Sequence, residues 1–268
     1  MTKNAITMQG NKKMKSTLKL LGFAVAASTT SMTFAAESKS EHTISGNIGV
    51  VSQYILRGNT ISPENDNAAV QGGLDYSHSS GFYAGYWGST LGYSLSDYNP
   101  VTESLEGSKA FEHDFYLGYN GKINDDLGYT LGAIYYLYTE SDVDSDFPES
   151  IVGINYKDFS LTAQTALDDS IFGNTGDTYI LGSYSHALPK DFTFNTSVGL
   201  YYNNNSGDYE GINYNTTEDF NFRHWTLGLS HPLGTTGATV AMDFVVGGKL
   251  RDDTSLKNKV VFGLKYEF

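Results

Sequence analysis

Apolar and polar residues alternate with a period of two through much of the chain, a pattern typical of β-strands with two unlike faces. The clearest case is the last segment, where every second residue from Val260 to Phe268 is apolar. Similar apolar files run through residues 127–137, 192–202 and 238–246. The positions between them hold mainly small and polar residues, which favours a wet interior over a packed sandwich core.

The alternating segments are separated by gaps that switch between short turns and long polar loops. This exchange predicts an all-β protein, a transmembrane antiparallel up-and-down β-barrel of about 12 strands, with the turns at one end and the loops at the other. A β-sandwich would show no rule about which connections are long. The predicted strands cover residues 43–57, 67–76, 81–92, 110–120, 127–139, 150–157, 158–168, 177–187, 191–203, 220–231, 237–249 and 257–268.

The N-terminus has the order of regions found in an export signal. Lysines come first, an apolar run follows, and small residues lead to a cleavage site at Thr33-Phe34-Ala35. We therefore expect a signal peptide over residues 1–35 and one barrel domain over residues 36–268. A signal that starts at Met14 has a more usual length, so the start of the chain stays open. No later apolar run reaches the ~18 residues of a spanning helix.

The composition of the chain limits the kinds of molecule that it can bind. The full chain has a formal net charge of −13. Removing residues 1–35 takes away five lysines and no acids, which brings the charge to −18. Such a charge argues against nucleic acid as a partner. The chain has no cysteine, so disulfides and thiolate metal sites are excluded, and its 20 tyrosines and 15 phenylalanines argue against disorder.

Charged residues in the inward phase are the candidates for lining a channel. The candidates are Arg57, Asp75, Glu112, Asp114, Asp243, Lys259 and Lys265, with Glu267 in the same phase. Each assignment depends on the register, because a one-residue bulge reverses the faces. Buried charges must be paired or hydrated, and a water-filled lumen offers both.

The third long loop is the most acidic and is the candidate for an acidic mouth. Its acids are Glu140, Asp142, Asp144, Asp146 and Glu149. Alternate oxygen ligands suit calcium, but Phe147 and Gly153 stand where an EF-hand needs glycine and glutamate. A solvated loop without a metal site is therefore the prediction. All six long loops together carry nineteen acidic and five basic residues, which favours cations or neutral solutes.

Two histidines raise the alternative of catalysis. His78 is followed by Ser79 and Ser80, but adjacent residues in a short turn do not form a working triad. His113 shares the apolar phase with Phe111 and Phe115 near the loop end, where a lipid-hydrolysing barrel would place a catalytic histidine. No serine partner is identifiable, so we expect no enzyme activity and no cofactor.

Residues 51–89 carry a resemblance to a known family. "YILRG", "QGGLDYSH" and "SGFYAGYWGS" resemble the opening of the TorF-type porins of proteobacteria, and weaker pieces such as "FYLGYNGKI" follow in order. The resemblance implies a bacterial outer-membrane channel for small solutes, in contact with outer-membrane lipid and lipopolysaccharide. A last strand ending in Phe268 also resembles the signal read by the barrel assembly machinery. A lipid-acting enzyme and a plugged receptor or structural barrel remain alternatives.

Overall fold

The computed structural model describes residues 40–60, 67–92, 98–99, 104–105, 110–141, 143–212 and 215–268. The expected signal peptide at residues 1–35 and the loop residue Asp142 lie outside the described residues. No helix among the described residues is long and apolar enough to span a membrane.

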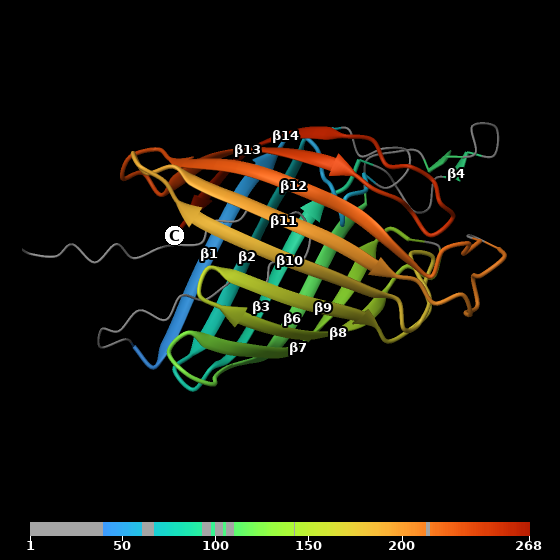
Figure 1. Cartoon of the computed structure of the whole chain (residues 1–268), viewed down its shortest axis with the longest axis horizontal. Coiled ribbons are helices and arrows are strands. Elements are labelled where there is room, and N and C mark those ends of the chain that lie inside the picture. Colours follow the sequence, from blue (N-terminus) through green and yellow to red (C-terminus); the bar gives the residue numbers. More distant parts are fainter. Residues whose placement is uncertain are drawn as a thin grey trace, which may run out of the picture.

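Twelve antiparallel strands close into a barrel in which consecutive strands are neighbours (Figure 1). This confirms the predicted fold class. The barrel strands are β1 (His42–Val51), β2 (Ala69–His78), β3 (Phe82–Thr90), β6 (Phe111–Lys122), β7 (Leu127–Thr139), β8 (Phe147–Tyr156), β9 (Phe159–Ala166), β10 (Thr178–Ala187), β11 (Thr193–Tyr202), β12 (Phe220–Pro232), β13 (Ala238–Gly247) and β14 (Lys259–Glu267). A separate two-stranded hairpin, β4 (Tyr98–Asn99) with β5 (Ser104–Leu105), lies in the second long loop and was not predicted.

The first and last strands close the barrel, as the C-terminal pattern predicts. β1 pairs with β14 from Asn47 opposite Glu267 to Val51 opposite Gly263. The backbones of Gly46 and Phe268 extend this pairing with two further hydrogen bonds of 2.9 and 3.0 Å. Among the described residues of the barrel strands, closure leaves only the start of β1, before Gly46, without a neighbour on the β14 side.

The outer surface of the barrel is apolar, and its residues are those of the predicted files. Phe262 is 58% exposed, whereas the residue before it, Val261, points to the inner face and is 2% exposed. The same contrast separates Val240, at 38%, from Thr239, at 4%. Large apolar side chains would not stay exposed in water over so wide a surface, so the barrel exterior suits hydrocarbon.

Short turns join the strands at the end where the chain terminates, and long loops join them at the other end (Figure 1). Gly81 shows how tight the short turns are. Its φ is +105°, and a Cβ there would lie 2.3 Å from the Asn120 carbonyl oxygen. The turn between β2 and β3 therefore needs glycine.

Two strand boundaries differ from the prediction in ways that move candidate residues. The first strand ends at Val51 instead of residue 57, so Arg57 is not on a strand. β8 begins at Phe147 instead of residue 150, so Glu149 belongs to a strand and not to a loop. Phe147 is buried and its ring stacks on Tyr136 at 4.8 Å, which extends the strand into the sequence predicted as loop.

Candidate functional site

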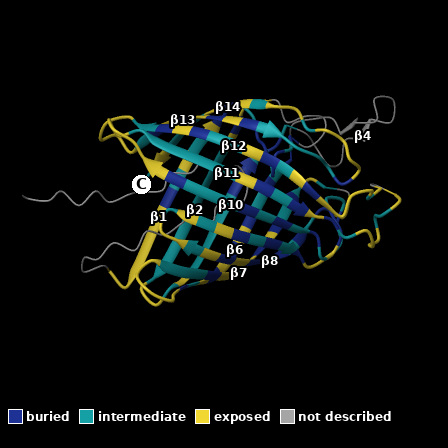
Figure 2. Ribbon diagram, in the orientation of Figure 1, coloured by how far each residue is buried: buried dark blue, intermediate teal, exposed yellow. Residues whose placement is uncertain are grey.

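The lumen changes character along the barrel axis. Near the short turns, its walls carry small polar side chains that hydrogen-bond across strands. The Ser185 hydroxyl donates to the Asn195 amide oxygen at 2.7 Å, and the Thr130 hydroxyl donates to that of Asn120 at 2.7 Å. Burial increases toward the long loops (Figure 2). The lumen is therefore polar at the turn end and filled by side chains at the loop end.

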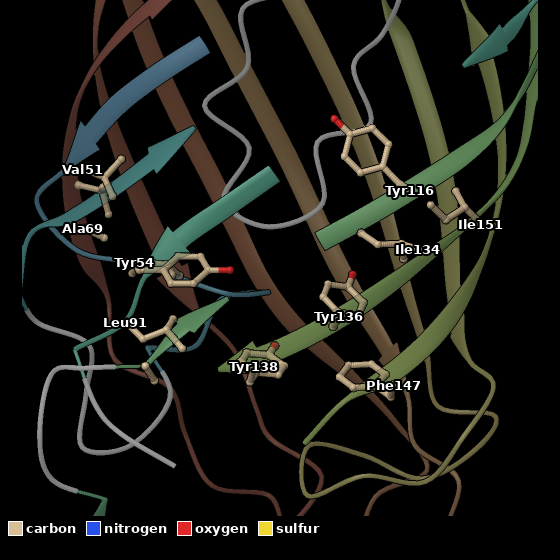
Figure 3. Close-up of a cluster of buried hydrophobic side chains, with 13 residues drawn as sticks. Val51, Tyr54, Ala69, Leu91, Tyr116, Ile134, Tyr136, Tyr138, Phe147 and Ile151 are labelled. Atoms are coloured by element: carbon tan, nitrogen blue, oxygen red, sulfur yellow. The ribbon is translucent and has the colours of Figure 1, made fainter. Parts of the chain in front are cut away.

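A hydrophobic cluster fills the loop end of the lumen (Figure 3). It is built mainly from the inward-facing residues of β6, β7 and β8 and from the chain that follows β1. The cluster contains Val51, Tyr54, Ile55, Ala69, Leu91, Ala110, Tyr116, Ile134, Tyr136, Tyr138, Phe147, Ile151 and Val261.

Residues 52–60, which we call the inner segment, leave β1 and fold into the barrel instead of continuing outward. Tyr54 lies against Trp87 of β3, with ring centroids 5.9 Å apart. Gly58 lies against the opposite wall, because a Cβ there would be 2.7 Å from the His224 Cβ of β12. The positive φ of Gly58, +81°, and this contact both require glycine. The inner segment thus crosses the lumen.

Arg57 holds the inner segment in place. Its guanidinium donates two hydrogen bonds to Glu149, at 2.8 and 2.5 Å, and one to the Tyr136 hydroxyl at 3.3 Å. The Tyr136 hydroxyl in turn donates to Glu149 at 3.0 Å. On its other side, the guanidinium carbon lies 4.9 Å from the centre of the Tyr179 ring. Arg57 was predicted to face the lumen from a strand; it lies in the lumen on a loop.

Acidic side chains line one wall beside this ion pair. Glu112 and Asp114 of β6 are buried, and Glu112 accepts a hydrogen bond from the Tyr138 hydroxyl at 3.3 Å. They lie near Glu149, which the sequence placed at the mouth and the structure places inside. Three carboxylates from β6 and β8 therefore share the loop end of the lumen with Arg57.

The opposite wall carries bases that sequence reasoning missed. A β-bulge at Gly199–Leu200 opposite β12 leaves Arg223 without a register partner. The Arg223 guanidinium lies over the inward-facing Tyr201 ring at 4.7 Å, and His224 contacts the Tyr179 hydroxyl at 2.6 Å. A bulge places two neighbouring residues on one face, and no signal in the alternation marks its position.

The remaining candidate lining residues are spread along β2, β13 and β14. Asp75 accepts a hydrogen bond from the Tyr116 hydroxyl. Lys265 pairs with Glu267 at 2.9 Å near the short turns, and Lys259 is half-buried near the long loops. Asp243 is buried against Gly228. These residues occupy the predicted inward phase, but the structure does not gather them into one cluster.

Only some of the acids predicted for the mouth are free charges on the loop. Glu140 is exposed, whereas Asp144 accepts a hydrogen bond from the Tyr209 hydroxyl at 3.0 Å. Asp146 accepts one from the Tyr138 backbone N–H at 2.8 Å. These two aspartates therefore help to order the loop.

Arg251 ties three long loops together at the same end. It pairs with Asp177 and lies 3.5 Å from Glu210, which also accepts a hydrogen bond from Asn174 at 3.0 Å. The loops after β9, β11 and β13 thus meet at one guanidinium. Sequence reasoning counted Arg251 only as one of few loop bases, because its partners are 41 and 74 residues away.

His113 lies on the outer surface, as its phase predicts. Its Nδ1 is 2.9 Å from the Tyr86 hydroxyl, and its ring centroid is 4.7 Å from that of Phe111. These contacts are those of an aromatic group on the barrel exterior.

A closed barrel with an apolar exterior, short turns at one end and long loops at the other defines the outer-membrane β-barrel class. Over residues 35–263 the chain matches the model of the family described as "Bacterial protein of unknown function (Gcw_chp)". The chain belongs to this family.

Comparison with solved structures supports the fold assignment. A KdgM porin has a TM-score of 0.51 and 9% sequence identity, with 84% of this chain and 99% of that chain covered. A NanC porin scores 0.48 at 14% identity, covering 84% and 99%, and outer membrane phospholipase A from Escherichia coli scores 0.44 at 14%, covering 82% and 94%. At these identities the likeness to the KdgM porin shows the fold alone. A search of curated proteins finds no match to the chain.

Proposed function

We propose that the protein is a bacterial outer-membrane, porin-like channel for passive diffusion of small polar or cationic solutes. The observation that carries this proposal is the lumen, which is polar toward the short turns and holds charged as well as aromatic side chains where it is filled toward the long loops. Residues 1–35 would serve as the export signal.

The preference for cations rests on charge at two places. The long loops carry an excess of acids, which raises the local concentration of cations over about 8 Å at physiological ionic strength. Inside, Glu112, Asp114 and Glu149 outnumber Arg57 on their side of the lumen. The basic side chains on the opposite wall, mainly Arg223, face these acids and create a strong electric field across the lumen. The orientation of a solute should therefore matter as well as its charge.

The remaining parts of the proposal concern chemistry and partners. The transport needs no cofactor and no enzyme activity, and it involves no nucleic acid. Outer-membrane lipid and lipopolysaccharide would surround the barrel, and the barrel assembly machinery would read the last strand during biogenesis. We also propose that the chain is a TorF-type porin, on the motifs "YILRG" and "QGGLDYSH".

The test is single-channel recording with the mature protein in a planar bilayer, followed by a reversal potential under a potassium chloride gradient. We expect discrete conductance steps and cation selectivity. Neutralising the loop acids, by Glu140→Gln, Asp142→Asn, Asp144→Asn and Asp146→Asn together, should reduce selectivity in dilute salt and have little effect at 1 M, where screening acts over about 3 Å. Glu149→Gln, made separately, reports on the lumen instead of the mouth.

Three results would overturn parts of this proposal. A selectivity for anions, or one that ignores the loop acids in dilute salt, rejects the loop mechanism. A protein that never conducts, with or without the inner segment released, is a plugged receptor or structural barrel. Hydrolysis of phospholipid by the purified protein that disappears in His113→Ala establishes a lipid-acting enzyme.

A further inference from the structure

Two histidines lie side by side on the outer surface of the barrel at the short-turn end. His42 begins β1 and His78 ends β2, and the two are direct cross-strand partners. Their ring centroids are 5.1 Å apart. Glu41 precedes His42, and its Oε1 lies 3.2 Å from the His78 Nε2. The three side chains can each turn one ligand atom into a common space, with all three atoms within 4.8 Å of one another.

This spacing is close to that of a metal site. Nitrogen and oxygen ligands about 2.0–2.2 Å from a tetrahedral ion lie about 3.3–3.6 Å from one another. The contact between His78 and Glu41, at 3.2 Å, is already close to this range. The side chains of His42 and Glu41 are exposed, so a small rotation brings the His42 ligand atom into range.

The Nδ1 atoms of the two histidine rings provide an independent indication of a metal site. A histidine that binds a metal through one ring nitrogen normally donates a hydrogen bond from the other, which fixes its orientation. The Nδ1 of His42 lies 2.8 Å from the Tyr76 hydroxyl, and the Nδ1 of His78 lies 2.7 Å from the Ser80 hydroxyl. This leaves Nε2 as the ligand atom of each ring, and that of His78 already lies 3.2 Å from the Glu41 Oε1.

The tautomer of His78 follows from the same contacts. Its Nδ1 is also 3.1 Å from the Ser80 backbone N–H, so without a metal the ring can accept from that group and donate from Nε2 to Glu41. A metal at Nε2 selects the other tautomer, in which Nδ1–H donates to the Ser80 hydroxyl. The Ser80 backbone N–H can therefore donate to His78 Nδ1 in the metal-free tautomer, and the Ser80 hydroxyl can accept from it in the metal-bound tautomer.

We propose that Glu41, His42 and His78 form a binding site for one borderline divalent transition ion of the Zn²⁺ class. Two imidazoles and one carboxylate suit such ions, whereas Ca²⁺ and Mg²⁺ prefer all-oxygen ligands. Three protein ligands leave one position for water. The site is on the outer surface, so it is separate from the lumen and does not depend on the proposed channel function.

The position in the barrel gives the ion a physical role. β1 pairs with β2 over its whole length, but with β14 only from Asn47 onward, apart from the two hydrogen bonds at Gly46. The first residues of β1 therefore have a neighbour on one side only, and strand ends of this kind open first. An ion held by residues of both strands would pin this free end of β1 to β2.

The experiment uses the mature protein without an affinity tag, refolded into detergent or lipid, because a histidine tag would bind the probe. Zn²⁺ is titrated by calorimetry, with Mg²⁺ as the unsuitable ion. We expect one Zn²⁺ per chain. His42→Ala and His78→Ala should each weaken binding by at least about tenfold, and Tyr76→Phe, which removes only the hydrogen bond to the ring, by about tenfold.

His186→Ala is the matched control. His186 is also exposed near the short turns, but it stacks on Tyr184 far from the cluster in the strand order, and its loss should leave Zn²⁺ binding unchanged. Zn²⁺ should slow hydrogen exchange of the first residues of β1 in the wild type and not in His42→Ala/His78→Ala. An absence of Zn²⁺ binding to the wild type, or binding that survives both histidine substitutions, overturns the proposal. Channel conductance should not respond to Zn²⁺ through this site, which separates its failure from that of the proposed function.

Discussion

The ion pair between Arg57 and Glu149 should be the contact that keeps the inner segment in the lumen. The perturbations are Arg57→Met and Glu149→Gln, alone and together. The two side chains are 8% and 1% exposed, and both guanidinium nitrogens that face the carboxylate bond to it. Removing one partner strands the other as a buried charge, which costs about 3–5 kcal/mol.

The double variant should be destabilised by less than the sum of the single variants, since neither charge is then left alone. The difference is the coupling energy of the pair, and we expect at least about 2 kcal/mol because the bonds are charge-assisted and paired. Urea unfolding in lipid vesicles gives the three free energies. The control is Lys157→Met. Lys157 is exposed and lies 3.6 Å from Asp126 of the neighbouring short turn, so its loss should leave the free energy of unfolding almost unchanged.

Release of the inner segment should also be visible locally. Trp87 lies beside Tyr54, so its fluorescence should change in the single variants, and single-channel conductance should rise as the segment leaves the lumen. Effects on stability that simply add, together with unchanged fluorescence and conductance, would refute the idea that this pair anchors the segment.

Two further predictions test the outer face and the loops. Val240→Arg should lower the stability of the folded barrel in bilayers by about 2–4 kcal/mol, because the side chain faces hydrocarbon. Thr239→Arg is directed into the lumen and should lower the stability by less. Equal effects of the two substitutions in a folding titration would count against the register. Hydrogen bonds from the Thr175 hydroxyl and backbone N–H, and from the Asp208 backbone N–H, hold the pKa of Asp169 below its ordinary value. A lowered folded-state pKa stabilises the loop above the unfolded value of about 3.9, and this contribution is lost as the pH falls through the lowered pKa. Protection of the Thr175 and Asp208 amides from hydrogen exchange should therefore fall at acid pH, and Asp169→Asn should show reduced protection at every pH; protection that is the same in both proteins is the contrary result.

The sequence alone predicted the fold and the two faces of most strands, although residues 82–89 are aromatic in both phases. A period of two is a local property, and the apolar files of β7, β11, β13 and β14 can be found without knowing their neighbours. The order of short and long connections then favours an up-and-down barrel, in which β1 meets β14. The phase of Glu112, Asp114 and Asp243 also followed from alternation, and the structure leaves all three on the inner side.

The tertiary structure decided what fills the lumen. Arg57 and Glu149 are 92 residues apart, and nothing local indicates that the chain after Val51 turns inward to meet β8. The length of β8 depends on Phe147 packing against Tyr136 on the neighbouring strand, and the position of Arg223 depends on a bulge that forms only against β11. Alternation fixes which way a side chain points, because that is set within one strand. Which charges are paired and which loop enters the barrel are set by contacts between distant segments, and these exist only once the barrel has closed.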